Sequence, residues 1–89
     1  MIGVGDPEAQ CRFLFKELQR LLEQAGGSLA DVTKLIVHLV SMADYPMFQK
    51  VRAEYFSDSE FPPTCSLVQV VALVRPQAVI GIEAIAVLA

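Results

Sequence analysis

The stretch VTKLIVHLVSM, residues 32–42, decides the fold of this 89-residue chain. It is rich in β-branched residues, which favour strands over helices. Side chains alternate between the two faces of a strand, so Leu35, Val37 and Leu39 form one fully apolar face. The other face is mixed and carries Lys34, Ile36, His38 and Val40. We therefore predict a strand of which both faces need partial cover.

A helix is predicted on each side of this strand. Before it, Asp6 suits an N-cap and Pro7 suits the first helical position. Apolar residues then recur at helical spacing until Gly26, which favours the end of a helix. After the strand, a second helix is expected from Asp44, with Pro46 in its first turn. Its apolar stripe consists of Met47, Phe48, Val51, Tyr55 and Phe56.

The rest of the chain predicts a loop and two more strands. SDSEFPP, residues 57–63, is polar and contains two prolines, which is typical of a loop. Strands are expected at 64–74 and 78–87, and Arg75-Pro76-Gln77 is interpreted as the turn of an antiparallel hairpin between them. The order helix, strand, helix, strand, strand indicates an α+β fold. Two helices cover one face of a sheet, so the other face must meet something else.

The composition indicates one small domain that associates with copies of itself. Hydrophobic residues make up 54% of the chain and charged residues 19%, which is less than the usual quarter. A chain of this size buries only about two-thirds of the surface that its unfolded form exposes. The excess of apolar residues favours a subunit interface, so we expect a homo-oligomer.

Several partners and locations are disfavoured by simple counts. The apolar runs are far shorter than the roughly 20 residues that span a membrane, and the N-terminus lacks the pattern of a secretory signal. A net charge of −3 without a basic stripe argues against nucleic acid. Cys11 and Cys65 are too few for a disulfide framework and lack metal-site spacing, so we expect a cytoplasmic protein without metal or cofactor.

Four segments carry a resemblance to a known family. GDPEAQ, LLEQAGGSLADVTKLIVHLVSMADYPMFQKVRAEYF, FPP and IEAIAV resemble the Rid family of reactive-intermediate deaminases, also called YjgF-like or endoribonuclease L-PSP proteins. The resemblance implies a single domain over residues 1–89 with a chorismate-mutase-like fold. In that fold two helices pack on one face of a mixed sheet, and three subunits pack sheet to sheet. Small-molecule pockets then lie in the clefts between subunits.

The chain departs from the family in two places. Family members are usually longer at the N-terminus, where a strand hairpin forms part of the pocket wall, and we expect this domain to lack that hairpin. The family's deaminases also carry an arginine that binds the substrate carboxylate, and Thr64 stands at its position. A neutral hydroxyl cannot replace the two-pronged hydrogen bonding of a guanidinium.

The resemblance places the candidate site near Glu83. Glu83 matches the family's glutamate that holds or activates the water that attacks an imine, so it is the candidate catalytic residue. The candidate ligand-binding residues are Thr64, Cys65, Ser66 and Glu83. Each has a structural alternative, because a carboxylate can hydrogen-bond across an interface and hydroxyls commonly open a strand after proline. His38, Arg75 and Cys11 are interpreted as structural residues.

The sequence therefore supports more than one function. The first hypothesis is a protein that binds a small metabolite in an intersubunit cleft, without the standard 2-imino acid deaminase activity. The alternative is a structural or interaction module with a vestigial pocket, since a missing hairpin would leave sheet edges open to a partner. An active imine deaminase ranks below these two, and a ribonuclease ranks last.

Overall fold

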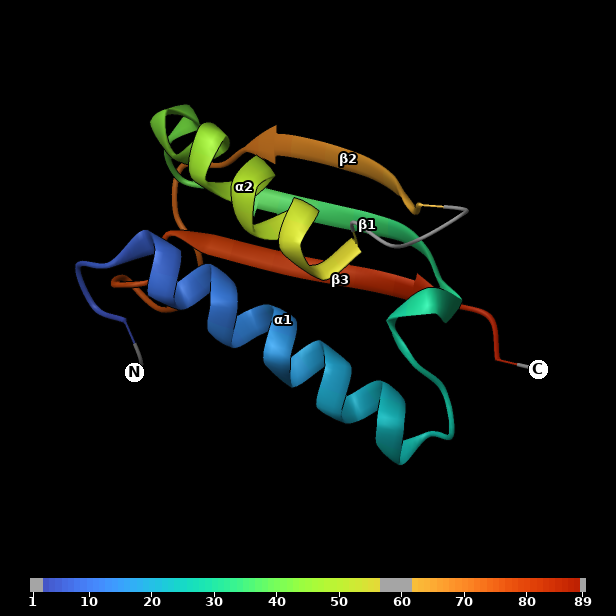
Figure 1. Ribbon diagram of the computed structural model, residues 1–89. Helices are drawn as coiled ribbons and strands as arrows, with labels where there is room; N and C mark the ends of the chain where they lie inside the picture. The colour runs from blue at the N-terminus through green and yellow to red at the C-terminus, as the bar shows by residue number, and fades with distance from the viewer. Residues whose placement is uncertain (1–2, 57–61, 89) are drawn as a thin grey trace.

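The computed structural model of the chain describes residues 3–56 and 62–88. Helices and strands follow in the predicted order (Figure 1), and they are α1 (Pro7–Gln24), β1 (Val32–Leu39), α2 (Tyr45–Phe56), β2 (Thr64–Gln69) and β3 (Ile80–Ala86). A 3-10 turn leads into β1 and another leads into α2. Most of the loop predicted at 57–63 lies outside the described residues.

The first helix begins and ends at the residues that its capping signals predict. The backbone N–H of Ala9 donates a hydrogen bond to Oδ1 of Asp6 at 3.1 Å, and Pro7 occupies the first turn. After the helix, Gly26 takes a φ of +87°, in the left-handed region that glycine enters at no steric cost. The helix prediction is confirmed at both ends.

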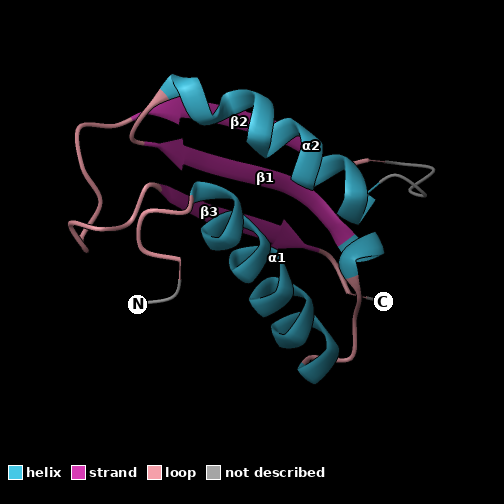
Figure 2. Ribbon diagram, turned by 60° about the vertical axis from the view of Figure 1, so that its left-hand side comes forward, coloured by secondary structure: helices cyan, strands magenta, loops and turns pink. Residues whose placement is uncertain are grey.

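The strands form one mixed sheet in the order β2-β1-β3, with β1 at its centre (Figure 2). β2 runs parallel to β1, and β3 runs antiparallel to it. Parallel neighbours need a crossover connection, and α2 supplies it. The unit β1-α2-β2 is therefore a strand-helix-strand crossover, and β3 adds to the free edge of β1.

The predicted hairpin between the last two strands is wrong. β2 and β3 pair with opposite edges of β1, so residues 70–79 cross from one edge of the sheet to the other. Hydrogen bonds tie both ends of this connection to β1 and the residue after it: Val70 N–H donates to Leu39 O at 2.8 Å, and Val40 N–H donates to Val79 O at 3.0 Å. The predicted turn does form, with Ala78 N–H bonded to Arg75 O, but it lies within the crossing segment.

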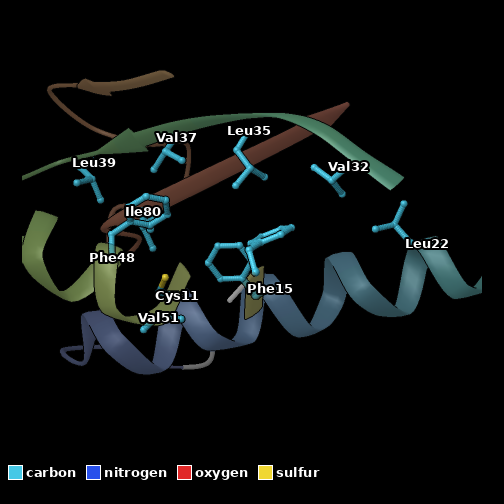
Figure 3. Close-up of a cluster of buried hydrophobic side chains, with 11 residues drawn as sticks. Cys11, Phe15, Leu22, Val32, Leu35, Val37, Leu39, Phe48, Val51 and Ile80 are labelled. Carbon is cyan, nitrogen blue, oxygen red and sulfur yellow. The ribbon is translucent and has the colours of Figure 1, made fainter. Parts of the chain in front are cut away.

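Both helices pack on one face of the sheet, as predicted (Figure 1). Figure 3 shows the core between the layers, where Leu35, Val37 and Leu39 of β1 point towards the helices. Phe15 of α1 lies at the centre of an aromatic cluster, with its ring centroid 5.1 Å from Tyr55 and 6.2 Å from Phe48. Such aromatic contacts add to the stabilisation from apolar burial.

Within the described residues, no helix is long and apolar enough to cross a membrane.

Candidate functional site

The candidate site lies on the face of the sheet opposite the two helices. We call this face the bare sheet face, because no described helix covers it. Alternation along the strands places three residues of each strand on it: Lys34, Ile36 and His38 of β1, Thr64, Ser66 and Val68 of β2, and Gly81, Glu83 and Ile85 of β3. The exposures agree, since Val68 and Ile85 remain 49% and 52% exposed while the core side of β1 is fully buried.

The strand register brings three of the four predicted site residues together. Ile36 at the centre of the sheet pairs with Ser66 on one side and with Glu83 on the other. Two strand spacings separate Ser66 from Glu83, which is about 10 Å between backbones. Thr64 lies one row further along β2, beside Lys34. A carboxylate and two hydroxyls therefore lie on one sheet face, with the side chain of Ile36 between Ser66 and Glu83.

Cys65 is the predicted site residue that lies apart from the others. It alternates with Thr64 and Ser66 and packs against the core on the helix side of β2. The other cysteine, Cys11, is fully buried in α1, and burial raises the pKa of its thiol to about 12. That thiol is protonated at neutral pH and unreactive.

The Thr64 hydroxyl already has a backbone partner. Its Oγ1 donates to Thr33 O at 3.4 Å, and the Thr33 hydroxyl in turn donates to Ile85 O at 3.2 Å. These bonds hold the irregular register between Val32 and Lys34, where β1 bends. Thr64 thus supports the strand ends and offers a ligand the lone pairs of its oxygen.

Glu83 is exposed in the single chain and forms no ion pair with another described residue. The neighbouring row of the bare sheet face holds His38, which is half-buried between Val68 and Gly81. A Cβ built on Gly81 would lie 3.5 Å from Cδ2 of Leu73, so the β2–β3 connection borders the space beside Glu83. This edge of the site is partly walled by apolar atoms.

Two features lie away from this face. Arg75 is an exposed residue in the turn of the crossing segment. A hollow of about 290 Å³ lies at the C-terminal end of α2, lined by Arg52, Phe56 and Pro62 among others, and none of the candidate site residues lines it. Among the residues that the structure describes, no group of three His, Cys, Asp or Glu side chains is placed to hold a metal ion.

Two polar residues near the site were not singled out from the sequence. Lys34 lies on the bare sheet face beside Thr64. One feature of the sequence could have marked it, because the three strands contain no other Lys or Arg. Gln10 is 3% exposed in α1, and its side-chain amide bonds to the backbone of Gln77 and Val79 at the entry to β3. No pattern in the chain reveals that long-range contact.

Comparisons with known proteins agree on one family for this chain. The sequence model of a family described as Endoribonuclease L-PSP matches residues 1–88. The chain is 42% identical to the 3-aminoacrylate deaminase RutC of Acinetobacter baylyi over 86 residues, which cover 97% of this chain and 66% of that protein. A RutC family protein of Pyrococcus horikoshii is 40% identical over 82 residues, or 92% of this chain and 63% of that one.

A solved structure gives the same picture. A member of the YjgF/YER057c/UK114 family from Mycobacterium tuberculosis superposes with a TM-score of 0.83 at 32% identity, over 89% of this chain and 65% of that one. The chain thus spans somewhat less than two thirds of the length of these relatives.

Proposed function

The chain belongs to the endoribonuclease L-PSP family, which includes the Rid and YjgF-like proteins, and we propose that it binds a small metabolite on the bare sheet face, in a cleft between subunits of a homo-oligomer. Its α+β fold is the chorismate-mutase-like fold of that family. One observation carries the proposal. Thr64, Ser66 and Glu83 meet on a sheet face that the helices leave exposed.

A second copy of the chain is the proposed cover for this face, and a trimer is the proposed assembly. Val68 and Ile85 are about half exposed there, and Val71 and Val74 of the crossing segment are 98% and 102% exposed. Several exposed apolar side chains on a small protein favour a subunit interface. Packing against a copy would also remove water from around Ser66 and Glu83.

The proposal separates binding from the family's standard deaminase chemistry. Thr64 carries no charge, and its hydroxyl is engaged by Thr33 O. A carboxylate ligand would therefore lack the bidentate partner that fixes its orientation, and orientation contributes much of the rate of an enzyme. Glu83 retains the capacity to accept a proton from water, so it is proposed as a ligand-binding residue with a latent role as a base.

The remaining alternatives rest on less. An interaction module with a vestigial pocket is favoured by the near-complete exposure of Val71 and Val74. The name of the Acinetobacter relative favours an active deaminase acting on an enamine such as 3-aminoacrylate. A ribonuclease ranks last, because the bare sheet face has a single lysine and RNA binding requires several cations along the backbone. The two free cysteines favour the proposed cytoplasmic setting.

Ammonia release from 2-aminoacrylate and 3-aminoacrylate tests the loss of deaminase activity. We expect the wild-type rate to equal the uncatalysed background. Thr64→Arg should raise the rate on 2-aminoacrylate at least about tenfold, because a guanidinium restores the bidentate contact. Thr64→Ser, the matched control, should stay at background. A wild-type rate well above background that Glu83→Ala abolishes would show an active deaminase instead.

Ligand binding is tested separately by NMR on the full-length chain. We expect titration with a small probe, propionate or propionamide, to shift the backbone amide signals of Thr64, Ser66 and Glu83. Signals from the outer side of α1 should stay in place. If neither probe shifts the three site signals, the interaction module becomes the better account.

A further inference from the structure

The distribution of positive charge singles out Lys34. Of the seven Lys and Arg residues, five lie on the two helices and Arg75 lies in the crossing segment. Arg12, Arg20 and Lys50 form ion pairs with glutamates of the helices. Lys34 takes part in no ion pair with any residue in the described ranges, and it is the sole Lys or Arg of the three strands.

The register places this cation beside the candidate ligand residues. Lys34 pairs directly with Thr64 on one side, which is about 5 Å between backbones, and with Ile85 on the other. Glu83 is its diagonal neighbour, at about 7–8 Å between Cα atoms, which long side chains can bridge. The one lysine and the one glutamate of the sheet therefore lie on the same face, close to the hydroxyls of Thr64 and Ser66.

Assembly would leave this cation in need of a partner. Lys34 is already half-buried in the single chain. A second copy packed on the bare sheet face would remove more water from its ammonium group, and a buried charge is costly unless it is paired. Two partners fit the geometry. One is Glu83 itself, and the other is an anion bound between Lys34 and the hydroxyls of β2.

We propose that Lys34 is the anion-binding residue of the bare sheet face, and that it holds the carboxylate of a small monocarboxylic ligand beside Thr64. The rest of such a ligand would then extend towards Glu83. This inference rests on the proposed function and names the chemical class of its ligand. A lysine ammonium is a compact point charge on a flexible stem, so it binds a carboxylate without fixing its orientation. That property fits a site that binds carboxylates but does not align them for rapid chemistry.

The experiment compares a charged probe with its neutral counterpart. Propionate and propionamide have nearly the same shape, and both are titrated into the 15N-labelled full-length chain while the amide signals of Thr64 and Glu83 are followed. The variants are Lys34→Gln, which removes the charge, and Lys34→Arg, which keeps it. Lys16→Gln is the matched control, because Lys16 is an exposed cation on α1.

We expect Lys34→Gln to weaken propionate binding at least about tenfold, as the loss of a charge-assisted hydrogen bond predicts. Lys34→Arg and Lys16→Gln should retain the wild-type affinity within about threefold. Propionamide should bind wild type and Lys34→Gln equally, and added salt should weaken propionate alone.

Two results would overturn the inference, and they differ in what else they overturn. In the first result, Lys34→Gln binds propionate as tightly as wild type, and the signals of Thr64 and Glu83 still respond. The site would then stand, and Lys34 would be assigned to an ion pair with Glu83. A wild-type chain in which neither probe moves these signals would remove the proposed function together with the role of Lys34.

Discussion

Gln10 is a polar side chain within an apolar core, and it joins two segments that are distant in sequence. Its Nε2 donates to Gly3 O at 2.9 Å and to Gln77 O at 3.0 Å, while Oε1 accepts from Val79 N–H at 2.9 Å. These bonds fix the residues that enter β3, two positions before Gly81 and four before Glu83. We infer that Gln10 anchors the start of β3, the strand that carries Glu83.

Substitution of Gln10 should therefore lower stability. Gln10→Leu would keep the side-chain volume but leave Val79 N–H and Gln77 O without their partner, while Gly3 O would keep its hydrogen bond from Asp6 N–H. We expect a loss of about 2–4 kcal/mol in the free energy of unfolding, measured by urea denaturation at fixed protein concentration. Gln24→Leu, at an exposed position of the same helix, should change it by no more than about 0.5 kcal/mol. Equal effects of the two substitutions would show that the amide bonds contribute nothing.

Single residues also show which of the predicted site residues the strands place on one face. Thr64, Ser66 and Glu83 could be named from the resemblance, and strand alternation brings them onto one face. Cys65 was grouped with them because it is adjacent in sequence, but the same alternation turns it to the core. The position of Lys34 beside Thr64 follows only from the register between β1 and β2. That register depends on how a helix crosses between the two strands, and no local pattern encodes it.

At the scale of whole elements, the helices were predictable because their signals are local. Asp6 caps the start of α1 and Gly26 follows its end, and both lie within a few residues of its apolar stripe. The pairing of β2 and β3 was not predictable from Arg75-Pro76-Gln77, since a turn signal specifies a local bend and leaves open which strands pair. The parallel crossover β1-α2-β2 places β2 on one edge of β1 and leaves the other edge for β3. Strand pairing is a contact across the chain, and short-range patterns do not determine it.

The two helices are joined by surface ion pairs whose strength depends on pH. Lys50 and Arg12 both hold the pKa of Glu8 below its usual 4.5, and Arg12 does the same for Glu54. A carboxylate with a lowered pKa in the folded state stabilises that state fully above the unfolded value. The contribution is lost as pH falls through the folded value. The stabilisation should therefore persist above about pH 4.5 and decline below it.

This dependence is checked by thermal unfolding between pH 3 and pH 7. We expect Glu54→Gln to lower Tm slightly at pH 7 and to reduce the drop in Tm below pH 4.5. Added salt should have the same effect on wild type, because these pairs are exposed. Glu23→Gln, at an exposed position of α1 outside the described ion pairs, is the control. A Glu54→Gln profile that parallels wild type at every pH would contradict the ion-pair account.

At the scale of the whole molecule, the sequence and the structure give the same reason to expect association. The chain is 54% hydrophobic, and its two helices cover one face of a three-stranded sheet. The apolar residues of the bare sheet face, Ile36, Val68 and Ile85, lie among the polar residues of the candidate site, with Ile36 between Ser66 and Glu83. The fold class followed from element order and the two-faced strand at 32–42. The proposed contact of this face with a second copy is a property of an assembly, which the order of elements in one chain does not specify.

The central claim is that the bare sheet face is both interface and ligand site, and the mass of the 89-residue chain in solution tests it most directly. Light scattering at micromolar concentration should give three times the 9.7 kDa chain mass. Ile36→Arg places a charge at the centre of the face and should shift the mass towards one chain with the circular dichroism unchanged. Leu21→Arg, at a 54% exposed position of α1, should leave the assembly intact. A stable wild-type monomer of 9.7 kDa would contradict the account.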